Sequence, residues 1–300
     1  MISGLGTALI TPFKANGAVD YEALARLLDT QLTGSVDFLV VLGTTAEAAT
    51  MTAEEKKEVR RFIADYVHHH SPLQHSGTLH SSLPLVLGLG GNNTAALCAE
   101  IEAMRDELIR DYAAILSVCP YYNKPNQEGL FLHFSAVAEA SPVPVILYNV
   151  PGRTGVNLLP ETVIRLYQAH PDKIQGIKEA SGNIAQIKHL IELAKPLQHS
   201  STQALSIISG DDGLACEVMQ AGGTGLISVA SNAFPEDFYA IVHNQDAALQ
   251  AKYNEVIKLL FAEGNPTGIK AVLANKGLIT NALRLPLVPA SEELQTALKH

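Results

Sequence analysis

The sequence predicts an α/β protein that folds as a (β/α)₈ TIM barrel with a C-terminal helical appendage. Eight short apolar segments rich in Val, Ile and Leu alternate with longer amphipathic segments, and the alternation ends near residue 232. The apolar segments show little in-and-out alternation, which is typical of parallel strands buried on both faces. Eight β-then-α units in series favour a closed barrel, with a doubly wound open sheet as the alternative. No GxGxxG fingerprint follows the first strand, which weakens the open-sheet, dinucleotide-binding interpretation.

The predicted elements follow from these patterns in chain order. The strands are expected at 5–10, 37–42, 85–89, 113–118, 143–148, 174–178, 206–209 and 225–229. Barrel helices are expected at 21–32, 53–67, 160–169, 183–194 and 211–221. Asp20 is a candidate N-cap for the first helix, and Thr52 with Glu55 forms a candidate capping box for the second. Four later helices, at 235–244, 246–263, 267–276 and 291–299, divide the chain into a catalytic barrel (1–232) and a C-terminal helical region (233–300).

Composition excludes several classes of function. No run approaches 18 apolar residues, so no membrane partner is expected. The net charge of −9 argues against nucleic acid and anionic membranes as partners. The N-terminus lacks a basic region followed by an apolar core and a cleavage site, and the three cysteines are too far apart to suggest a disulfide framework or a metal site. We therefore expect a cytoplasmic protein with no cofactor.

Residues 68–82, HHHSPLQHSGTLHSS, look like an insertion and contain five histidines. Such a composition is compatible with a metal site or with a solvated loop. The segment joins a helix to the next strand, which places it on the barrel face opposite catalysis, and no carboxylates or cysteines are spaced near it as ligands. We therefore predict a loop and no metal.

The strand ends point to carbonyl chemistry, because the active sites of such barrels collect there. Lys178 ends an apolar strand, and burial favours the neutral amine that attacks a carbonyl. An ion pair with Glu179 is the structural alternative for this lysine. Tyr148, at the end of the preceding strand, carries a phenol that can exchange protons, although a buried aromatic with a bonded hydroxyl would explain it equally.

Two further loops offer groups that bind carboxylates. Gly43, Thr44 and Thr45 supply hydroxyls and backbone N–H groups where a strand gives way to a turn, a nest that suits a carboxylate. Arg153 lies in a loop bounded by Pro and Gly, and its planar fork can bind a second carboxylate in two places. A plain turn and a surface salt bridge are the alternatives for these two features.

Five motifs carry a resemblance to a known family. They are GTTAE at 43–47, PYYN at 120–123, YNVPGRTG at 148–155, GIKEA at 176–180 and SGDD at 209–212. Together with ALITPF at 8–13 and Leu285-Pro286, they resemble dihydrodipicolinate synthase over essentially the whole chain except the His-rich insert. The lysine and tyrosine motifs are shared with the wider superfamily of pyruvate-dependent class I aldolases, whereas the arginine motif is narrower.

The resemblance implies a condensation of pyruvate with aspartate semialdehyde to 4-hydroxy-tetrahydrodipicolinate, in the diaminopimelate route to lysine. It implies that Lys178 forms the imine, that Tyr148 shuttles protons, and that Thr45 links Tyr148 to Tyr122 from a neighbouring subunit. It further implies a homotetramer, a dimer of dimers. The implied substrate-binding residues are Thr44 and Thr45 for pyruvate, Arg153 for aspartate semialdehyde, and Gly210 and Ile227, which present backbone groups near the lysine.

Other functions are compatible with these motifs, and the sequence differs from the family pattern in two places. N-acetylneuraminate lyase and 2-keto-3-deoxy sugar acid aldolase share the Schiff-base chemistry, but Arg153 disfavours a polyol substrate; a catalytically silent keto-acid-binding barrel is the non-enzymatic alternative. Ala46 stands where the family usually has glycine; alanine would be strained if this turn needed a positive φ, but the neighbouring residues match the family, so we expect the change to be tolerated. The residues that align with the lysine-effector site of lysine-sensitive relatives are Ala48, Ala49, Ala53, Lys56, Asn92, Ala96 and Tyr121. Ala96 stands where a glutamate is expected, which predicts weak or absent lysine inhibition.

Overall fold

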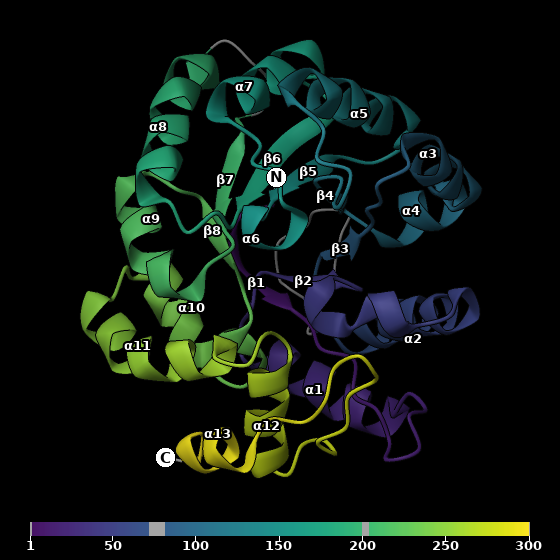
Figure 1. Ribbon diagram of the computed structural model, residues 1–300, viewed down its shortest axis with the longest axis vertical. Coiled ribbons are helices and arrows are strands. Elements are labelled where there is room, and N and C mark those ends of the chain that lie inside the picture. The colour runs from purple at the N-terminus through teal and green to yellow at the C-terminus, as the bar shows by residue number, and fades with distance from the viewer. Residues whose placement is uncertain (1, 72–81, 200–203, 300) are drawn as a thin grey trace. The chain divides into compact units, whose positions relative to one another are not determined.

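The eight strands form a closed barrel in the order β1 to β8, as the sequence predicts (Figure 1). The computed structural model describes residues 2–71, 82–199 and 204–299. Each strand begins and ends within two residues of its predicted segment. The strands are β1 Gly4–Ala8, β2 Phe38–Val41, β3 Leu85–Gly88, β4 Ala114–Val118, β5 Val145–Asn149, β6 Ile174–Glu179, β7 Ser206–Ser209 and β8 Gly225–Ser228.

The chain divides into two compact units, which we describe separately. Unit 1 comprises Met1–Gly4 and Leu85–Ile227, and it contains β3 to β7 and most of β8. Its helices are α3 Thr94–Ala103, α4 Arg105–Asp111, α5 Gln127–Ala140, α6 Pro151–Thr154, α7 Pro160–Ala169, α8 Ile184–Ala194 and α9 Ala215–Ala221. Unit 2 comprises Leu5–Pro84 and Ser228–His300, with most of β1 and all of β2. Its helices are α1 Tyr21–Thr33, α2 Ala53–His70, α10 Pro235–His243, α11 Ala247–Phe261, α12 Thr267–Asn275 and α13 Glu292–Ala297.

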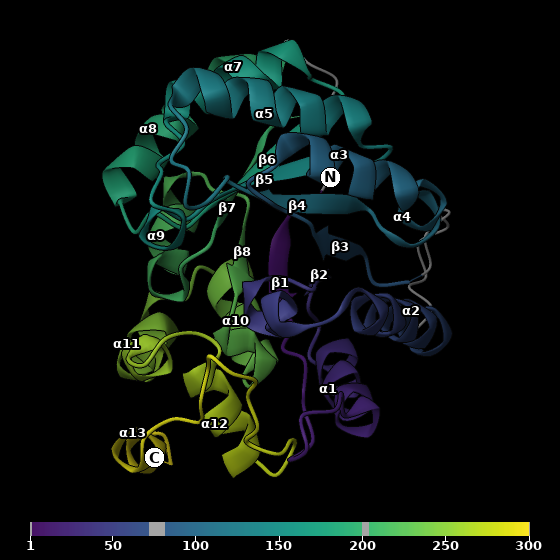
Figure 2. The same ribbon diagram turned by 45° about the vertical axis from the view of Figure 1, so that its right-hand side comes forward.

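In unit 1, helices cover the outer face of the strands that carry the candidate site. Figure 2 shows α5 lying over β5 and β6, with α3 beside it. The α5 side chains Phe134 and Val137 and the β5 side chains Val145 and Leu147 are fully buried. Burial on both faces explains why the strands read as continuous apolar runs. Helices α3 to α6 were not predicted from the sequence. Helix α5 is apolar on most of its surface, so it lacks the amphipathic pattern that identifies a surface helix.

In unit 2, the predicted helix starts are confirmed. The side chain of Asp20 accepts a hydrogen bond from the Ala23 backbone N–H, and Thr52 and Glu55 form the reciprocal capping box. The end of α2 was predicted wrongly, because the helix continues to His70 instead of stopping at Val67. Three of the five histidines of the predicted insertion are therefore helical, and His75 and His80 lie outside the described residues.

The start of α9 and the apolar character of the helices can also be compared with the sequence. The predicted helix at 211–221 begins later than expected, because a 3₁₀ turn over Asp212–Leu214 precedes α9 and the Asp211 side chain accepts from the Gly213 N–H. Within the described parts of the chain, none of the helices combines the length and the apolar character that crossing a membrane requires.

Candidate active site

Lys178 and Tyr148 lie side by side at the ends of β6 and β5. They are direct partners in the parallel register of these strands, so both side chains point to the same face of the sheet. Lys178 is 6% exposed and Tyr148 is 8% exposed. The Lys178 Nζ atom lies 4.4 Å from the centroid of the Tyr148 ring. The arrangement places an amine and a phenol together in a largely desolvated position, which suits nucleophilic attack on a carbonyl with proton exchange.

Gly210, directly after β7, makes room for the lysine side chain. Its backbone N–H donates to the Glu179 carbonyl at 2.7 Å, which holds the two strand ends together. A Cβ atom at this position would lie 2.9 Å from Lys178 Cε and 3.1 Å from Lys178 Cγ. Only glycine therefore fits beside the extended lysine stem without a shift. Ile227, the other residue implied near the lysine, lies buried in β8.

Glu179 points away from Lys178 and lies in a network of neutral polar groups. Adjacent residues of a strand face opposite sides, so the ion pair considered from the sequence is not how these two residues are arranged. The Glu179 carboxylate accepts from Asn149 Nδ2 at 2.9 Å, from the Ser181 N–H at 2.8 Å and from Gln186 Nε2 at 3.1 Å. Asn157 extends this network to Asn149 and Gln186. The network fixes the end of β6 on the face of the strand opposite to Lys178.

Cys119 adds to the buried surroundings of this carboxylate. Its backbone N–H donates to the Tyr148 carbonyl at 2.9 Å, so it joins the end of β4 to β5. Burial, reinforced by the negative charge of Glu179, raises the pKa of the Cys119 thiol to about 12. The thiol therefore stays protonated at neutral pH and has a packing role rather than a nucleophilic one.

In unit 1, the loops after β4 and β5 bring Tyr122 and Arg153 close together. The Tyr122 N–H donates to the Thr154 carbonyl at 3.3 Å, and Arg153 lies in the short helix α6 beside it. The Tyr122 side chain is 88% exposed, and its backbone has a positive φ of 74°. A bulky residue rarely adopts this conformation, and such outliers concentrate at functional positions. Arg153 is exposed, as a residue that meets an incoming substrate would be.

In unit 2, the turn after β2 carries Thr44 and Thr45. Residues Thr44–Ala46 form a 3₁₀ turn, in which Thr44 is exposed and Thr45 is buried. The Thr45 hydroxyl oxygen accepts from Asn265 Nδ2 at 2.9 Å, which leaves the hydroxyl hydrogen to be donated elsewhere. The condition for strain at Ala46 is not met, because the positive φ of this turn belongs to Glu47, at 54°. Alanine therefore costs no backbone strain at position 46.

Within each unit, further polar groups hold the candidate residues in place, and these groups were not predicted from the sequence. In unit 1 these are Asn149, Asn157 and Gln186 around Glu179; in unit 2 they are Asn265, Lys270 and Arg284 around the Thr44–Thr45 turn. Lys270 had a visible signal, because it interrupts the apolar stretch of α12. The others gave none: Asn149 ends β5, Gln186 lies in α8, and Asn157, Asn265 and Arg284 are polar residues outside the helices and strands.

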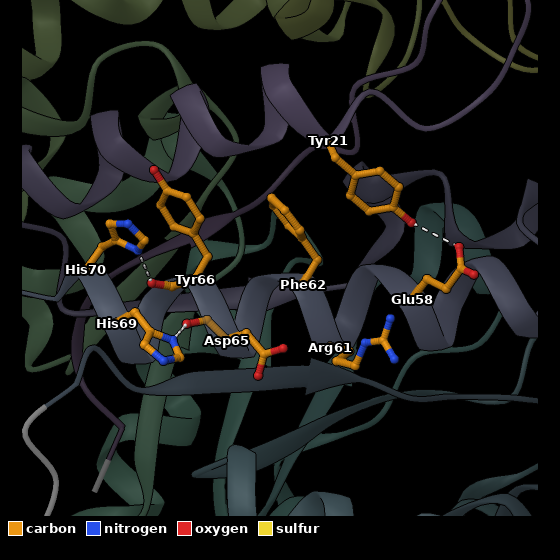
Figure 3. A pocket seen from close by; sticks show the side chains of 8 residues that line it. All are labelled: Tyr21, Glu58, Arg61, Phe62, Asp65, Tyr66, His69 and His70. Carbon is orange, nitrogen blue, oxygen red and sulfur yellow. Dashed lines mark hydrogen bonds between the residues drawn. The ribbon is translucent and has the colours of Figure 1, made fainter.

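A pocket of about 570 Å³ lies along α2 in unit 2, and Tyr21 at the start of α1 also lines it (Figure 3). Tyr21, Phe62 and Tyr66 line it as neighbouring rings, and the Tyr21 hydroxyl donates to Glu58 at 3.3 Å. At the end of the pocket, the Nδ1 groups of His69 and His70 donate to backbone carbonyls one turn earlier. Among the residues that the structure describes, no three His, Cys, Asp or Glu side chains are grouped to hold a metal ion.

Comparisons with known proteins show the family of this chain. The chain matches the model of the dihydrodipicolinate synthetase family over residues 1–300. It is 44% identical over 295 residues to a 4-hydroxy-tetrahydrodipicolinate synthase of Parabacteroides distasonis, covering 96% of this chain and 92% of the relative. Its structure is similar to dihydrodipicolinate synthase from Thermotoga maritima, with a TM-score of 0.89 and 36% identity over 100% of this chain and 97% of the other.

A second structural relative was solved with a ligand in place. The dihydrodipicolinate synthase of Acinetobacter baumannii, complexed with pyruvate, has a TM-score of 0.87 and 35% identity, covering 100% of this chain and 97% of the other. The match of family, sequence and fold extends over the whole chain and includes the strand ends described above. The chain belongs to the dihydrodipicolinate synthetase family.

Proposed function

We propose that this chain catalyses the 4-hydroxy-tetrahydrodipicolinate synthase reaction, the condensation of pyruvate with L-aspartate 4-semialdehyde in the diaminopimelate route to lysine. The observation that carries the proposal is the buried Lys178 amine 4.4 Å from the Tyr148 ring. The names of the relatives, at 44% identity over nearly the whole chain, support the same reaction. It is a lyase-type, Schiff-base condensation that uses no cofactor.

In the first half of the reaction, Lys178 acts as the nucleophile. Its neutral amine attacks C2 of pyruvate, water leaves, and the resulting iminium withdraws electrons from C3, so that loss of a C3 proton gives an enamine. Tyr148 accepts and returns the protons that move during these steps. Thr45 and Tyr122 extend the proton relay from Tyr148. The Asn265 bond to the Thr45 oxygen supports this role, because it leaves the threonine hydrogen as the donor.

In the second half, C3 of the enamine attacks the aldehyde carbon of aspartate semialdehyde and forms the new carbon–carbon bond. The amino group of that substrate then attacks the iminium carbon, closes the ring and releases the Lys178 amine. Thr44 and Thr45 bind the pyruvate carboxylate, and Arg153 binds the carboxylate of the semialdehyde. Gly210 and Ile227 present backbone groups beside the lysine, which the close packing of Gly210 against the lysine stem supports.

The proposal also includes an assembly and a compartment. A homotetramer, built as a dimer of dimers, would let Tyr122 enter a neighbouring subunit's site; its 88% exposed side chain supports this. Sedimentation tests it, because a fully active monomer would contradict a shared site. A cytoplasmic location is supported by the three cysteines, because none of them forms a disulfide within the described residues. We further propose that residues 1–232 form the catalytic barrel and 233–300 a C-terminal helical region.

A substrate panel tests the proposed reaction directly. Pyruvate is held constant, and aspartate semialdehyde, N-acetylmannosamine and glyceraldehyde are offered in turn. The proposal expects the highest kcat/KM with aspartate semialdehyde, whose carboxylate meets Arg153. A preference for N-acetylmannosamine or glyceraldehyde would instead indicate a sugar acid aldolase.

A further inference from the structure

Glu47 is a buried carboxylate that directly follows the Thr44–Ala46 turn. Its side chain is fully buried, and its backbone adopts the left-handed conformation with φ 54° and ψ 33°. A glutamate gains nothing from this conformation by itself, so the surrounding structure must hold it. Its backbone N–H donates to the Thr44 carbonyl at 3.1 Å, which links the position of Glu47 to that of the turn.

Two groups of the C-terminal part of unit 2 hold the Glu47 carboxylate. Lys270 Nζ, on α12, donates to Oε1, and the Arg284 backbone N–H donates to Oε2 at 3.0 Å. Lys270 is itself fully buried and donates a second hydrogen bond to the Ala282 carbonyl at 3.0 Å. Burial lowers the pKa of Lys270 to about 8, although the charge of Glu47 opposes this shift. A lysine is kept at such a position only when it is paired.

The Arg284 side chain connects this hydrogen-bonded cluster to the start of α2. Its guanidinium donates to both oxygens of Glu55, at 2.5 and 2.8 Å, and to the Thr50 carbonyl at 3.1 Å. The arginine holds the pKa of Glu55 at about 2, so this pair is charged at neutral pH. The Phe13 ring contacts both cations, with its centroid 4.3 Å from Lys270 Nζ and 4.2 Å from Arg284 Cζ. Two acids and two bases therefore balance inside one packed cluster.

Asn265, just before α12, reaches the turn from the same side. Its Nδ2 donates to the Thr45 hydroxyl oxygen at 2.9 Å. The turn is thus fixed at two points: at Thr45 by Asn265, and at Glu47 by Lys270 and Arg284. All of these contacts join residues more than 200 positions apart within unit 2.

We propose that Glu47 and Lys270 are positioning residues that set the geometry of the Thr44–Thr45 turn for the carboxylate of the keto acid, without touching the substrate themselves. The inference rests on the proposed function, because it assigns pyruvate to that turn. Hydroxyl and N–H groups bind a carboxylate only when they converge on it, so a displaced turn loses affinity for this one ligand. Groups that bind the aldehyde substrate in unit 1 remain unchanged.

Two variants test the inference. Glu47→Asp keeps the charge balance but shortens the arm by one methylene, so it moves either the turn or its two hydrogen bonds. The double variant E47Q/K270M removes both charges together, which avoids the isolated buried charge that either single change would leave. Matched controls are Glu54→Asp, on the exposed start of α2, and K188M/E217Q, which removes an exposed ion pair of 2.7 Å.

The readout is the pyruvate concentration that half-saturates borohydride-trapped adduct formation, together with KM for each substrate and the melting curve. We expect at least a tenfold rise for pyruvate in both variants, less than a twofold change in KM for aspartate semialdehyde, and no change in the controls. An unchanged pyruvate value in a folded variant, or equal changes for both substrates, would overturn the inference. Absence of pyruvate adduct in the unmodified protein would instead refute the proposed function, so the two failures are distinct.

Discussion

The Lys178 Nζ atom lies 4.4 Å from the centre of the Tyr148 ring, and the two residues are register partners on neighbouring parallel strands. Their distance is therefore set by the spacing of the sheet rather than by flexible loops. The Glu179 network fixes the end of β6 from the other face. Catalytic groups on such a support keep their geometry while a substrate enters and leaves.

Substitution of Gly210 should disturb the lysine without unfolding the barrel. In Gly210→Ala, the new methyl group would lie 2.6 Å from Ala180 Cβ and 2.9 Å from Lys178 Cε, so both neighbours, including the lysine stem, must move. We expect kcat/KM for pyruvate to fall at least tenfold. Gly91→Ala is the matched control, because a Cβ there meets nothing within 4 Å. Steady-state kinetics and melting curves test this prediction. Equal activities of the two variants would show that the lysine tolerates the methyl group.

Arg153 should select the aldehyde substrate. Loss of a charge-assisted clamp costs roughly 1.5–3 kcal/mol, which corresponds to about a 10- to 150-fold change. Arg153→Ala should raise KM for aspartate semialdehyde by this factor and change KM for pyruvate little. Arg165→Ala removes an exposed arginine that pairs with Glu128 and serves as the control. Similar changes for both substrates would remove Arg153 from this role.

Lysine should inhibit the reaction weakly or not at all. Position 96, where the glutamate of lysine-sensitive relatives is expected, is alanine and cannot pair with the ammonium of the effector. A buried charge without a partner costs about 3–5 kcal/mol. Lys56 adds a positive charge at another position that aligns with the effector site. Initial rates with added lysine measure the inhibition. Half-inhibition below a millimolar would show that the lysine-effector site is intact.

His133 should make the fold sensitive to mild acid. It is buried on α5 and hydrogen-bonded through Nδ1 to the Thr94 hydroxyl at 2.9 Å, and burial lowers its pKa from 6.5 to about 4. Between these values the unfolded chain binds a proton that the folded chain does not, so stability falls as the pH drops from 6.5 to 4. The loss is about 2–3 kcal/mol.

Unfolding by urea across this pH range measures the contribution of His133 to stability. His133→Gln should flatten the dependence of the unfolding free energy on pH, whereas His68→Gln, at an exposed position of α2, should not. The same slope in both variants would assign the acid sensitivity to the carboxylates.

The barrel could be predicted because its strands are buried on both faces and therefore stand out as apolar runs. Helices α7 and α11 were predicted because one face is apolar and caps or proline mark their starts. By contrast, α3 and α5 carry apolar residues around most of their circumference, which hides the helical period. The extra turn of α2 was missed because three consecutive histidines look like a loop in sequence.

Positions at strand ends could likewise be predicted, since the topology of a barrel gathers them. The polar groups that support these positions could not be predicted, because they are close to them in space but far from them in the sequence. Glu47 and Lys270 are 223 residues apart, and neither residue type predicts the other. The glycine usual in the family at position 46 drew attention to that residue, whereas the left-handed φ lies at Glu47, where the buried ion pair can hold a glutamate.

The most direct test of the central claim is the position of the pyruvate adduct. The protein is incubated with pyruvate, reduced with borohydride, digested and mapped by mass spectrometry, with Lys173→Ala as a control for a lysine close to β6 whose Nζ bonds the Ser141 carbonyl. We predict one three-carbon adduct per chain, on Lys178, unchanged in Lys173→Ala and absent from Lys178→Ala. An adduct on another lysine, or one that persists in Lys178→Ala, would contradict the account.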